Sequence, residues 1–166
     1  MLVIQALTKK TQTKKKKMKL HQSTIKNVDM ADDVTIIEPC NLYECTLHEN
    51  VFVGPFSEIQ NGVIVGSHTR IQSHSFICEK VIIGDNCFIG HGVMFTNDLF
   101  KEGYPDADAM IETNIGNNVS IGSNATILPI NICDGVVIGA GSVVTKNITT
   151  KGVYAGNPAR LLRTLD

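Results

Sequence analysis

Aliphatic side chains recur at intervals of six residues along most of this chain, and a glycine often follows them at once. The period breaks after Phe95 and resumes at Ile115. One later step, from Ile127 to Ile132, is five residues instead of six. Upstream of the main run the same period is present but ragged, at Leu47, Leu42 and Ile36. The main run is Val53, Ile59, Val65, Ile71, Ile77, Ile83, Ile89 and Phe95, and the later members are Ile115, Ile121, Ile127, Ile132, Ile138 and Val144.

A six-residue period fits neither a helix, which repeats every 3.6 residues, nor a plain alternating strand. It fits a chain that turns a corner every six residues, so that three corners close a triangular coil. The aliphatic residue of each side then points inward, and corner positions require small residues or unusual backbone angles. The triplets at 84–86, 116–118 and 122–124 provide such corners. We therefore predict an all-β column of roughly six stacked coils.

Two segments depart from the period. Residues 96–114 are polar and contain Gly and Pro, which predicts an external loop inserted at one corner. The ending at 155–166 predicts a short C-terminal helix that caps the column, with Asn157 as N-cap and Pro158 in the first turn. Its apolar side would consist of Leu161, Leu162 and Leu165.

Charge divides the chain into two parts, although the net charge is only -1. Residues 1–19 contain seven lysines and no acid, whereas the remainder is acidic. We expect residues 1–19 to be a basic, disordered extension and residues 20–166 to be the folded domain. An acidic domain argues against nucleic-acid binding.

Composition is consistent with a single soluble domain. An apolar content of 43% is enough for a core, and the aromatic content of 5% with 14 glycines favours a narrow interior. No apolar stretch approaches the roughly 20 residues that cross a bilayer, and no signal segment is recognisable, so we expect a cytoplasmic protein without a membrane partner. The five cysteines contain no CxxC pair, which predicts free thiols and no zinc site.

Three runs carry a resemblance to a known family. SIGSNATILP at 120–129, VVIGAGSVVTKNI at 136–148 and VYAGNPARLLR at 153–163 resemble the hexapeptide-repeat acyltransferases, whose fold is a left-handed parallel β-helix. One departure is ILPINIC at 127–133, which is one residue shorter than the usual pattern and lacks its corner glycine.

Within this family, residues 73–100 are similar to enzymes that N-acetylate amino sugars carried on dTDP or UDP, for O-antigen or other surface polysaccharides. The resemblance implies acetyl-CoA as co-substrate and no metal. It also implies a homotrimer with active sites between subunits, where acetyl-CoA and the nucleotide sugar meet.

Acetyl transfer to an amine requires a neutral nucleophile, a polarised thioester and a proton acceptor. His91, flanked by Gly90 and Gly92, is our first candidate for a general base or a contact with acetyl-CoA. The alternative interpretation is that His91 is a solvated surface residue without a role in catalysis. His74 is the second candidate catalytic residue, because it lies 17 residues earlier, nearly one coil, which would place the two histidines on adjacent coils. A sugar amine is less basic than lysine and partly neutral at pH 7, so positioning alone is an alternative to base catalysis.

The loop offers candidates for contacts with the acceptor. Asn97 and Asp98 open it and have the groups needed to bind sugar hydroxyls or orient the amine, although Asn-Asp is also an ordinary turn sequence. Glu102 and Tyr104 are weaker candidates for sugar or nucleotide contacts.

The resemblance also implies where the coenzyme lies. It places the pantetheine arm along stacked corners, near the backbone of Gly122, Ser123, Gly139 and Ala140. The coenzyme phosphates would lie near the C-terminal cations Lys146, Arg160 and Arg163, each of which alone is an ordinary solvated charge.

Three other functions compete with N-acetylation. O-acetylation of a sugar or small-molecule hydroxyl would demand a true base at His91. A non-catalytic β-helix used as an assembly part would need neither the loop nor the C-terminal ending. A γ-class carbonic anhydrase resembles the chain only in fold, because its zinc site needs a pair of histidines five apart and the spacings here are 27, 20, 6 and 17.

Overall fold

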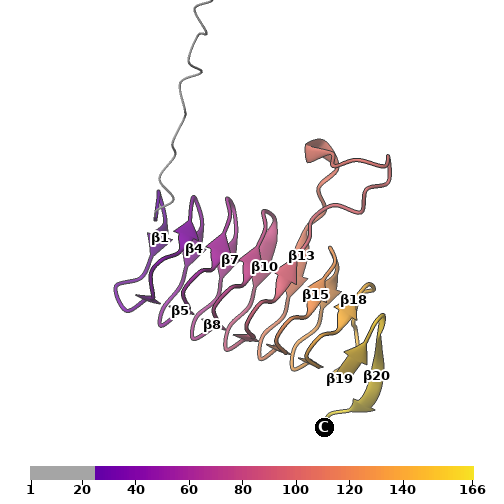
Figure 1. Ribbon diagram of the computed structural model, residues 1–166. Helices are drawn as coiled ribbons and strands as arrows, with labels where there is room; N and C mark the ends of the chain where they lie inside the picture. Colours follow the sequence, from indigo (N-terminus) through magenta and orange to yellow (C-terminus); the bar gives the residue numbers. More distant parts are fainter. Residues whose placement is uncertain (1–24) are drawn as a thin grey trace, which may run out of the picture.

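The computed structural model describes residues 25–166, whose backbone winds into a three-sided column of short strands (Figure 1). Each coil contributes one strand to each of three sheets, and strands of successive coils pair in parallel. Six successive coils are complete, because two sheets hold six strands each and the remaining sheet holds eight. This arrangement confirms the three-sided coil that the repeat predicts and the left-handed parallel β-helix that the family resemblance implies.

The strands are two or three residues long in every coil. The first sheet comprises β1 (Asp29–Met30), β4 (Thr46–Leu47), β7 (Ile64–Val65), β10 (Val81–Ile83), β13 (Thr113–Ile115) and β16 (Asn131–Ile132). The second comprises β2 (Thr35–Ile36), β5 (Phe52–Val53), β8 (Arg70–Ile71), β11 (Phe88–Ile89), β14 (Ser120–Ile121), β17 (Val137–Ile138), β19 (Gly152–Gly156) and β20 (Ala159–Thr164). The third comprises β3 (Asn41–Leu42), β6 (Glu58–Ile59), β9 (Phe76–Ile77), β12 (Met94–Phe95), β15 (Thr126–Ile127) and β18 (Val143–Val144).

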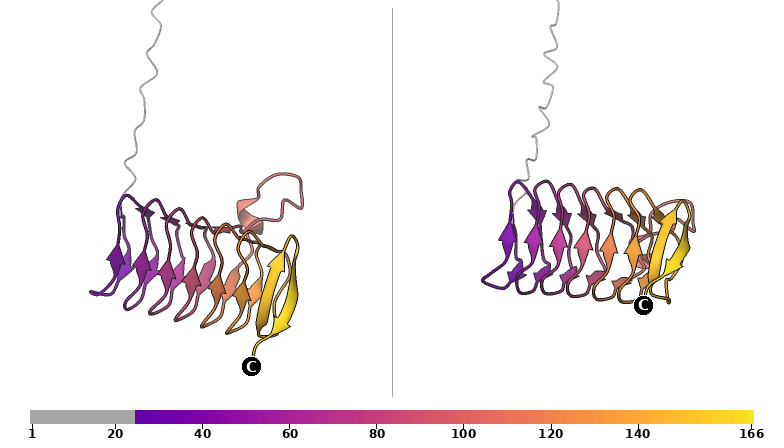
Figure 2. Two further views of the ribbon diagram at one scale, coloured as in Figure 1. Left: turned by 60° about the horizontal axis from the view of Figure 1, so that its bottom comes forward. Right: turned by 90° about the horizontal axis from the view of Figure 1, so that it is seen from below.

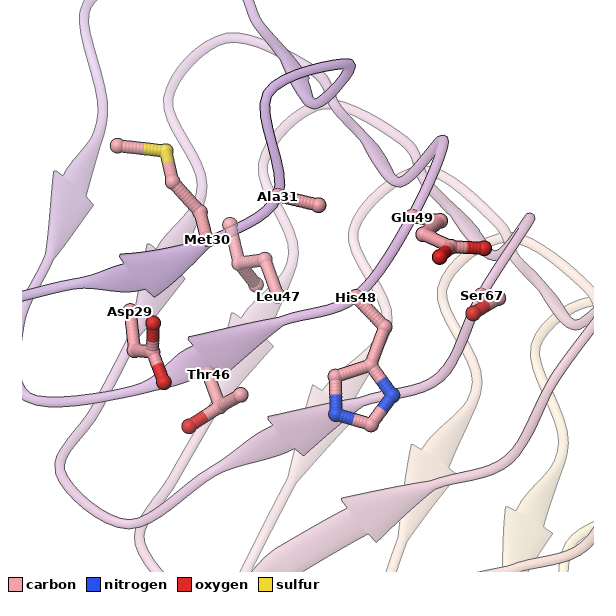
Figure 3. Close-up of a pocket in the computed structure, with 8 residues that line it drawn as sticks. All are labelled: Asp29, Met30, Ala31, Thr46, Leu47, His48, Glu49 and Ser67. Atoms are coloured by element: carbon pink, nitrogen blue, oxygen red, sulfur yellow. The ribbon is translucent and has the colours of Figure 1, made fainter.

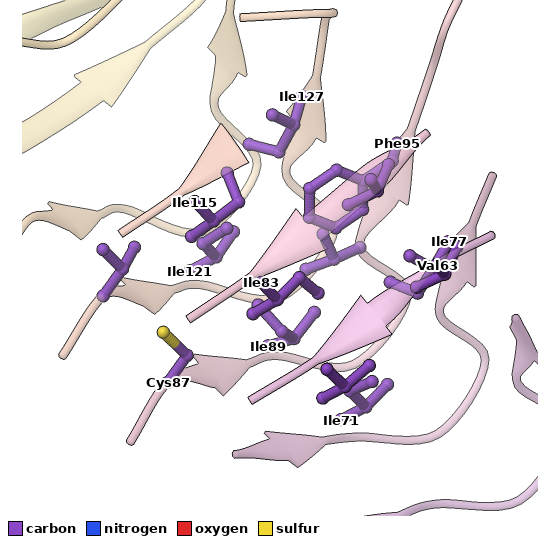
Figure 4. Packing of buried hydrophobic residues seen from close by; sticks show 14 of the residues in the cluster. Val63, Ile71, Ile77, Ile83, Cys87, Ile89, Phe95, Ile115, Ile121 and Ile127 are labelled. Atoms are coloured by element: carbon purple, nitrogen blue, oxygen red, sulfur yellow. The ribbon is translucent and has the colours of Figure 1, made fainter. Parts of the chain in front are cut away.

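Stacked aliphatic side chains fill the interior of the column (Figure 4). In β11 and β14, for example, Ile89 and Ile121 are fully buried and lie in register, one coil apart. Successive coils are separated by about 4.8 Å, so each side chain packs on its counterpart above and below. Burying each such chain contributes roughly 1.5–3 kcal/mol, which explains how the core forms with a single buried ring, that of Phe95, in the described part.

Three columns of corners connect the sheets. We call them the first corner (first to second sheet), the second corner (second to third sheet) and the third corner (third sheet to the next coil). At the first and second corners the second turn residue adopts a left-handed backbone, as at Asn86 (φ 56), Asn118 (φ 58) and Asn124 (φ 58). Asparagine tolerates this conformation well, so these residues form the corners that their triplets predict.

The glycine that follows the repeat aliphatic has a different purpose. A Cβ added to Gly66 would lie 2.5 Å from the carbonyl carbon of Gly84 on the next coil. A Cβ on Gly122 would lie 2.5 Å from the Ala140 nitrogen. The two five-residue steps of the repeat, Leu42 to Leu47 and Ile127 to Ile132, both fall at the third corner.

The predicted C-terminal helix is wrong. The segment forms an antiparallel hairpin of β19 and β20 at the end of the column (Figure 2). The outer edge of β17 would otherwise expose unpaired backbone groups, and β19 pairs with it, as in the 2.8 Å bond from the Gly139 N–H to the Tyr154 carbonyl. Leu161 and Leu162 are 46% and 66% exposed, so they do not form the apolar side of a helix.

The predicted loop is present with a corrected boundary. It runs over residues 96–112 and contains a short 3-10 helix, η1 (Ala107–Ala109). Thr113 and Asn114 belong to β13 instead, because they resume the parallel ladder opposite Val81 and Ile82 of β10. Figure 1 shows the loop projecting from the column beside β13.

The predicted basic extension, residues 1–19, lies outside the described residues. The described cysteines are free, as expected: Cys45, Cys78 and Cys87 are buried, and Cys40 and Cys133 are partly buried. No helix among residues 25–166 has the length and apolarity to cross a membrane.

Candidate active site

The second corner stacks His91 in a straight row with three other turn residues. Backbone bonds fix this row, because the residue after each member donates to the carbonyl of the member one coil earlier. The Gly92 N–H donates to Ser73 at 3.0 Å, and the Asn124 N–H donates to His91 at 2.8 Å. The row is Ser73, His91, Ser123 and Ala140, and we call it the corner row.

At the first corner, side chains satisfy the equivalent backbone N–H groups. The Ser67 N–H donates to the Oδ1 of Asp85 at 2.7 Å, and the Asp85 N–H donates to the Oδ1 of Asn117 at 2.8 Å. The Asn117 N–H continues the ladder to the Oδ1 of Asp134 at 2.8 Å. At the first corner, an Asp or Asn side chain of one coil therefore accepts a hydrogen bond from the backbone N–H of the coil before it.

The corner row lacks this ladder because its side chains are Ser, His and Ala. Among the hydrogen bonds of residues 25–166, none uses the backbone N–H of Ser73, His91, Ser123 or Ala140 as a donor. Four backbone donors thus stand along one corner at a rise of about 4.8 Å per coil. Such a row matches an extended ligand with amide carbonyls, or an oxyanion.

Two predicted coenzyme contacts take a different role in the structure. The Gly122 and Gly139 N–H groups donate to the carbonyls of Ile138 and Tyr154, both at 2.8 Å, so they are engaged within the column. Their lack of a side chain is what matters, because a Cβ on Gly122 would collide with Ala140. Of the four predicted coenzyme contacts, Ser123 and Ala140 are therefore the ones whose backbone N–H groups belong to the unpaired donors of the corner row.

Both candidate histidines lie on this corner, on adjacent coils. His91 is exposed, and its Nδ1 lies 2.8 Å from the Ser73 Oγ. His74 has a left-handed backbone (φ 63), and its ring stacks against that of Phe56 with centroids 4.9 Å apart. His74 follows Ser73 in the turn, so it stacks below Gly92 rather than below His91.

A cavity of about 310 Å³ opens at the other edge of the third sheet, beneath the start of the loop. The Asn97 Nδ2 donates to the Glu79 carbonyl at 3.3 Å, and the Glu79 N–H donates to the Gln60 Oε1 at 3.3 Å. The Thr96 Oγ1 is buried without a partner among the described residues. We call this the third-corner cavity; it is lined by Tyr43, Gln60, Phe76, Cys78, Glu79, Phe95, Thr96, Asn97, Asp98, Phe100 and Met110.

The third-corner cavity is acidic. Burial raises the pKa of the Tyr43 hydroxyl, and the negative charges of Glu58, Glu79 and Glu44 raise it further. Among residues 25–166, no lysine or arginine lines the cavity. Aromatic rings beside a carboxylate bind hydroxyl-bearing or cationic groups, and they disfavour phosphate.

Asp98 organises the loop. Its Oδ1 accepts from the Phe100 N–H and its Oδ2 accepts from the Asp106 N–H, both at 2.7 Å. Both bonds lower the pKa of the Asp98 carboxyl, and the bond from the Asp106 N–H has the larger effect. Asp98, Glu102 and Tyr104 line a second cavity of about 190 Å³ within the loop. Three of the four predicted loop residues, Asp98, Glu102 and Tyr104, therefore share a cavity, whereas Asn97 lines the third-corner cavity.

Two of the three predicted phosphate-binding cations share a cavity. Lys146 and Arg160 line a hollow of about 270 Å³ between the last coil and the C-terminal hairpin, together with Tyr154. Arg163 lies on β20 opposite Val153 and does not line that hollow.

A further hollow, of about 400 Å³, lies at the opposite end of the column (Figure 3). It is formed mainly by the ends of β1 and β4 and is lined by Asp29, Met30, Ala31, Thr46, Leu47, His48, Glu49 and Ser67. Within residues 25–166 no group of three His, Cys, Asp or Glu side chains is arranged to hold a metal ion. Its residues Glu49 and Ser67 lie at the first corner, whereas His91 lies at the second corner, so the hollow is not part of the corner row.

The structure does not bring all predicted residues into one site within a single chain. His91 and His74 lie at the second corner, and Asn97 and Asp98 begin at the third, so the third sheet separates them. The sequence interpretation missed Ser73 and the cavity residues Tyr43, Gln60 and Glu79. A signal existed, because Tyr43, Gln60, Glu79 and Asn97 follow one another at spacings of 17, 19 and 18 residues, about one coil each.

Two family models match the chain. A hexapeptide repeat of succinyl-transferase matches residues 80–94 and 112–146, and a bacterial transferase hexapeptide (six repeats) matches residues 44–79. The chain is 34% identical over 120 residues to a probable macrolide acetyltransferase of Lysinibacillus sphaericus, covering 58% of this chain and 67% of that protein.

The chain is also 30% identical over 143 residues to the bifunctional protein GlmU of Streptococcus uberis. This match covers 85% of the chain but only 29% of GlmU, so the chain spans less than a third of that relative's length.

Among solved structures, a galactoside acetyltransferase in complex with coenzyme A has a TM-score of 0.62 at 31% identity, covering 72% of this chain and 64% of the other. A maltose O-acetyltransferase from Clostridium difficile has a TM-score of 0.52 at 28% identity, with coverages of 87% and 70%. A perosamine N-acetyltransferase variant from Caulobacter crescentus, bound to CoA and GDP-perosamine, shares the fold at 16% identity, with a TM-score of 0.58 and coverages of 84% and 57%.

Proposed function

Because the chain belongs to the hexapeptide-repeat transferase family, we propose that it transfers an acetyl group from acetyl-CoA to the amine of an amino sugar carried on a nucleotide. The observation that carries this proposal is the corner row, whose four backbone N–H groups have no acceptor within residues 25–166 and which also presents the His91 imidazole. The pantetheine arm of acetyl-CoA is an extended chain with two amides, and it matches these donors.

The coenzyme would run along the corner row toward the C-terminal hairpin. Its phosphates would reach the hollow lined by Lys146 and Arg160, which lies at that end of the column. The Ser123 N–H, one coil beyond His91, would then stabilise the oxyanion that forms on the thioester carbonyl. The galactoside acetyltransferase, a relative at 31% identity, is bound to coenzyme A, which supports the choice of donor.

In the reaction the neutral amine nitrogen attacks the acetyl carbon, and the C–N bond forms as the carbon–sulfur bond breaks. The sulfur leaves as the coenzyme A thiolate. The proton lost by the amine passes to His91 and from there to the thiolate or to water. Holding the amine against the thioester would supply the rest of the acceleration.

The third-corner cavity supports an amine as acceptor. Glu79 and the rings of Tyr43 and Phe76 line it without any lysine or arginine, which suits a sugar that bears an amine. The nucleotide is supported by the perosamine N-acetyltransferase, a neighbour of like fold that binds GDP-perosamine. We further propose a role in making O-antigen or a related surface polysaccharide.

Two copies of the chain would complete one site, in a homotrimer of parallel columns. His91 and the third-corner cavity lie at opposite edges of one sheet, so a neighbouring copy is needed to bring a loop to a histidine. Phe88 and Met94, which flank the His91 corner on two faces, are 42% and 44% exposed and would be covered by that neighbour. Light scattering should then give three times the chain mass of 18.1 kDa.

O-acetylation of a sugar hydroxyl is the second candidate. It is favoured by the 28% identity to a maltose O-acetyltransferase, which exceeds that to the perosamine enzyme. The two reactions are distinguished by incubating the protein with acetyl-CoA and a panel of dTDP- and UDP-linked amino sugars, galactosides and maltose. An amide product from an amino sugar supports our proposal, and an ester product from a hydroxyl acceptor alone would replace it.

A further inference from the structure

Two histidines of this chain make the same hydrogen bond with different partners. The His91 Nδ1 lies 2.8 Å from the Ser73 Oγ, and the His68 Nδ1 lies 2.9 Å from the Asn50 Nδ2. In both pairs the partner stands 18 residues earlier, on the preceding coil, and both imidazoles are exposed at a corner. The pairs therefore differ mainly in the chemistry of the partner.

The partner decides where the proton of a neutral imidazole lies. One ring nitrogen carries a proton and donates, and the other accepts. An amide nitrogen only donates, so the Asn50 Nδ2 makes the His68 Nδ1 an acceptor and leaves the proton on Nε2. A hydroxyl can accept, so Ser73 allows the His91 Nδ1 to carry the proton while Nε2 keeps its lone pair.

With the proton on Nδ1, the same hydrogen bond also survives protonation of His91. When Nε2 takes up a proton, the Nδ1–H continues to donate to the Ser73 Oγ, and no rotation is needed. His68 would lose its bond on protonation, because its Nδ1–H would face the Asn50 amide nitrogen. Of the two histidines, only His91 is thus held in one position through a cycle of proton uptake and release.

The turns on either side of His91 carry no carboxylate that could accept a hydrogen bond from its Nδ1–H in place of Ser73. Its ring is flanked by the corner turns of residues 72–75 and 122–125 on the adjacent coils, and His74 is the only titratable residue on those two turns. The flanking residues Gly90 and Gly92 have no side chain. A carboxylate, the common partner of a catalytic histidine, is absent from these turns, and the Ser73 hydroxyl stands in its place.

We propose that Ser73 is a positioning residue that keeps the proton of His91 on Nδ1, so that Nε2 accepts the proton released by the acceptor amine. This inference rests on the proposed acetyl transfer for its catalytic part. The amine nitrogen gains the acetyl carbon, sulfur leaves with the electrons of the C–S bond, and the amine proton moves to Nε2. The imidazolium then returns that proton to the thiolate or to water.

Three substitutions at Ser73 test the assignment. Ser73→Thr retains the hydroxyl and should keep kcat within about threefold of the parent, whereas Ser73→Ala should lower kcat by about tenfold. Ser73→Asn offers an amide instead, and with its nitrogen toward Nδ1, as Asn50 presents its own toward His68, it should lower kcat by roughly 10²-fold with KM for acetyl-CoA unchanged. The first corner already places Asn117 at the equivalent turn position, so asparagine is compatible with the fold.

The matched control is Asn50→Ala, which breaks the His68 bond and should leave kcat unchanged. The acidic limb of the kcat/KM profile should move in Ser73→Ala and Ser73→Asn and stay in place in Ser73→Thr. A merely structural role for Ser73 would lower activity without moving that limb, and this result would overturn the inference.

¹⁵N NMR of the imidazole nitrogens shows which ring nitrogen of His91 carries the proton, and this measurement does not depend on enzymatic activity. The inference predicts a protonated Nδ1 in neutral His91 of the parent and a protonated Nε2 in Ser73→Asn. A protonated Nε2 in the parent would overturn it. A protonated Nδ1 in a protein that transfers no acetyl group would instead overturn the proposed function and leave the role of Ser73 in place.

Discussion

The Asp98 Oδ2 accepts a hydrogen bond from the Asp106 N–H at 2.7 Å, across eight residues of the inserted loop. The other carboxylate oxygen accepts from the Phe100 N–H, so one side chain fixes both the start and the middle of the loop. Because the loop lines two of the cavities described above, its order decides the shape of the proposed acceptor site.

We expect Asp98→Asn to loosen the loop, because an amide retains one acceptor oxygen and cannot accept both bonds. Hydrogen exchange at the amides of Phe100 and Asp106 should become faster by about tenfold or more, while exchange in β12 and β13 stays slow. KM for the acceptor should rise and KM for acetyl-CoA should not. Unchanged exchange at both amides would contradict this role of Asp98.

The same contact predicts a pH dependence of loop order. Folding lowers the pKa of Asp98, so the contact stabilises the loop above the ordinary pKa of an aspartate and is lost as the pH falls through the lowered value. Hydrogen exchange at the Asp106 amide, corrected for its intrinsic pH dependence, should therefore rise only under strongly acidic conditions. A loosening at pH 6 to 7 would exclude the carboxylate as its cause.

Close approach of coils makes Gly66 intolerant of a side chain. In Gly66→Ala the new Cβ would meet the Gly84 carbonyl carbon at 2.5 Å, so we expect a loss of about 1–3 kcal/mol in unfolding free energy. Gly62→Asn is the matched control, because Gly62 has a left-handed φ of 72 with no atom within 4 Å of an added Cβ. Asparagine adopts that conformation at other corners, so its cost should stay below about 1 kcal/mol. Thermal unfolding at equal protein concentration compares the two.

Burial protects two thiols from alkylation. It raises the pKa of Cys45 and of Cys78 to about 11. At pH 8 only about one in 10³ of each is thiolate, so iodoacetamide should spare both in the folded protein and modify them after unfolding. Mass mapping of the modified peptides checks this. Rapid labelling of Cys78 in the native state would show that the wall of the third-corner cavity opens.

The hollow at the C-terminal hairpin should bind the phosphates of the coenzyme. Removing both cations in Lys146→Gln with Arg160→Gln should raise KM for acetyl-CoA roughly five- to tenfold, the loss expected for two exposed ionic contacts. Arg163→Gln, which lies outside that hollow, is the matched control and should have little effect. Acetyl-pantetheine, which lacks the nucleotide phosphates, should react equally well with the parent and the double variant.

The β-helical column could be predicted from the repeat because the conformation of each coil depends on residue types within that coil. A buried aliphatic such as Ile89, a glycine such as Gly84 and an asparagine such as Asn118 each satisfy a local requirement that recurs in every coil. The hairpin at the C-terminus was not predictable in this way. Leu161, Leu162 and Leu165 fit a helical spacing, and the competing factor was the open edge of β17, which no sequence pattern displays.

The site was predictable in part. The glycines around His91 and the polar start of the loop indicated two of its regions, but the unpaired donors of the corner row depend on which side chains the neighbouring coils lack. Asp85 and Asn117 close the first corner, whereas Ser73 and Ser123 leave the second corner open. Recognising that difference requires each turn residue to be assigned to the first or the second corner, and the six-residue period alone does not provide that assignment.

The corner row is the centre of this account, and its amides report on it directly. Coenzyme A added to ¹⁵N-labelled protein should shift the backbone amide resonances of His91, Ser123 and Ala140, and leave those of Ser67, Asp85 and Asn117 at the first corner unchanged. Saturable shifts confined to the second corner are the predicted result. No shift at the corner row, or shifts at the first corner instead, would contradict it.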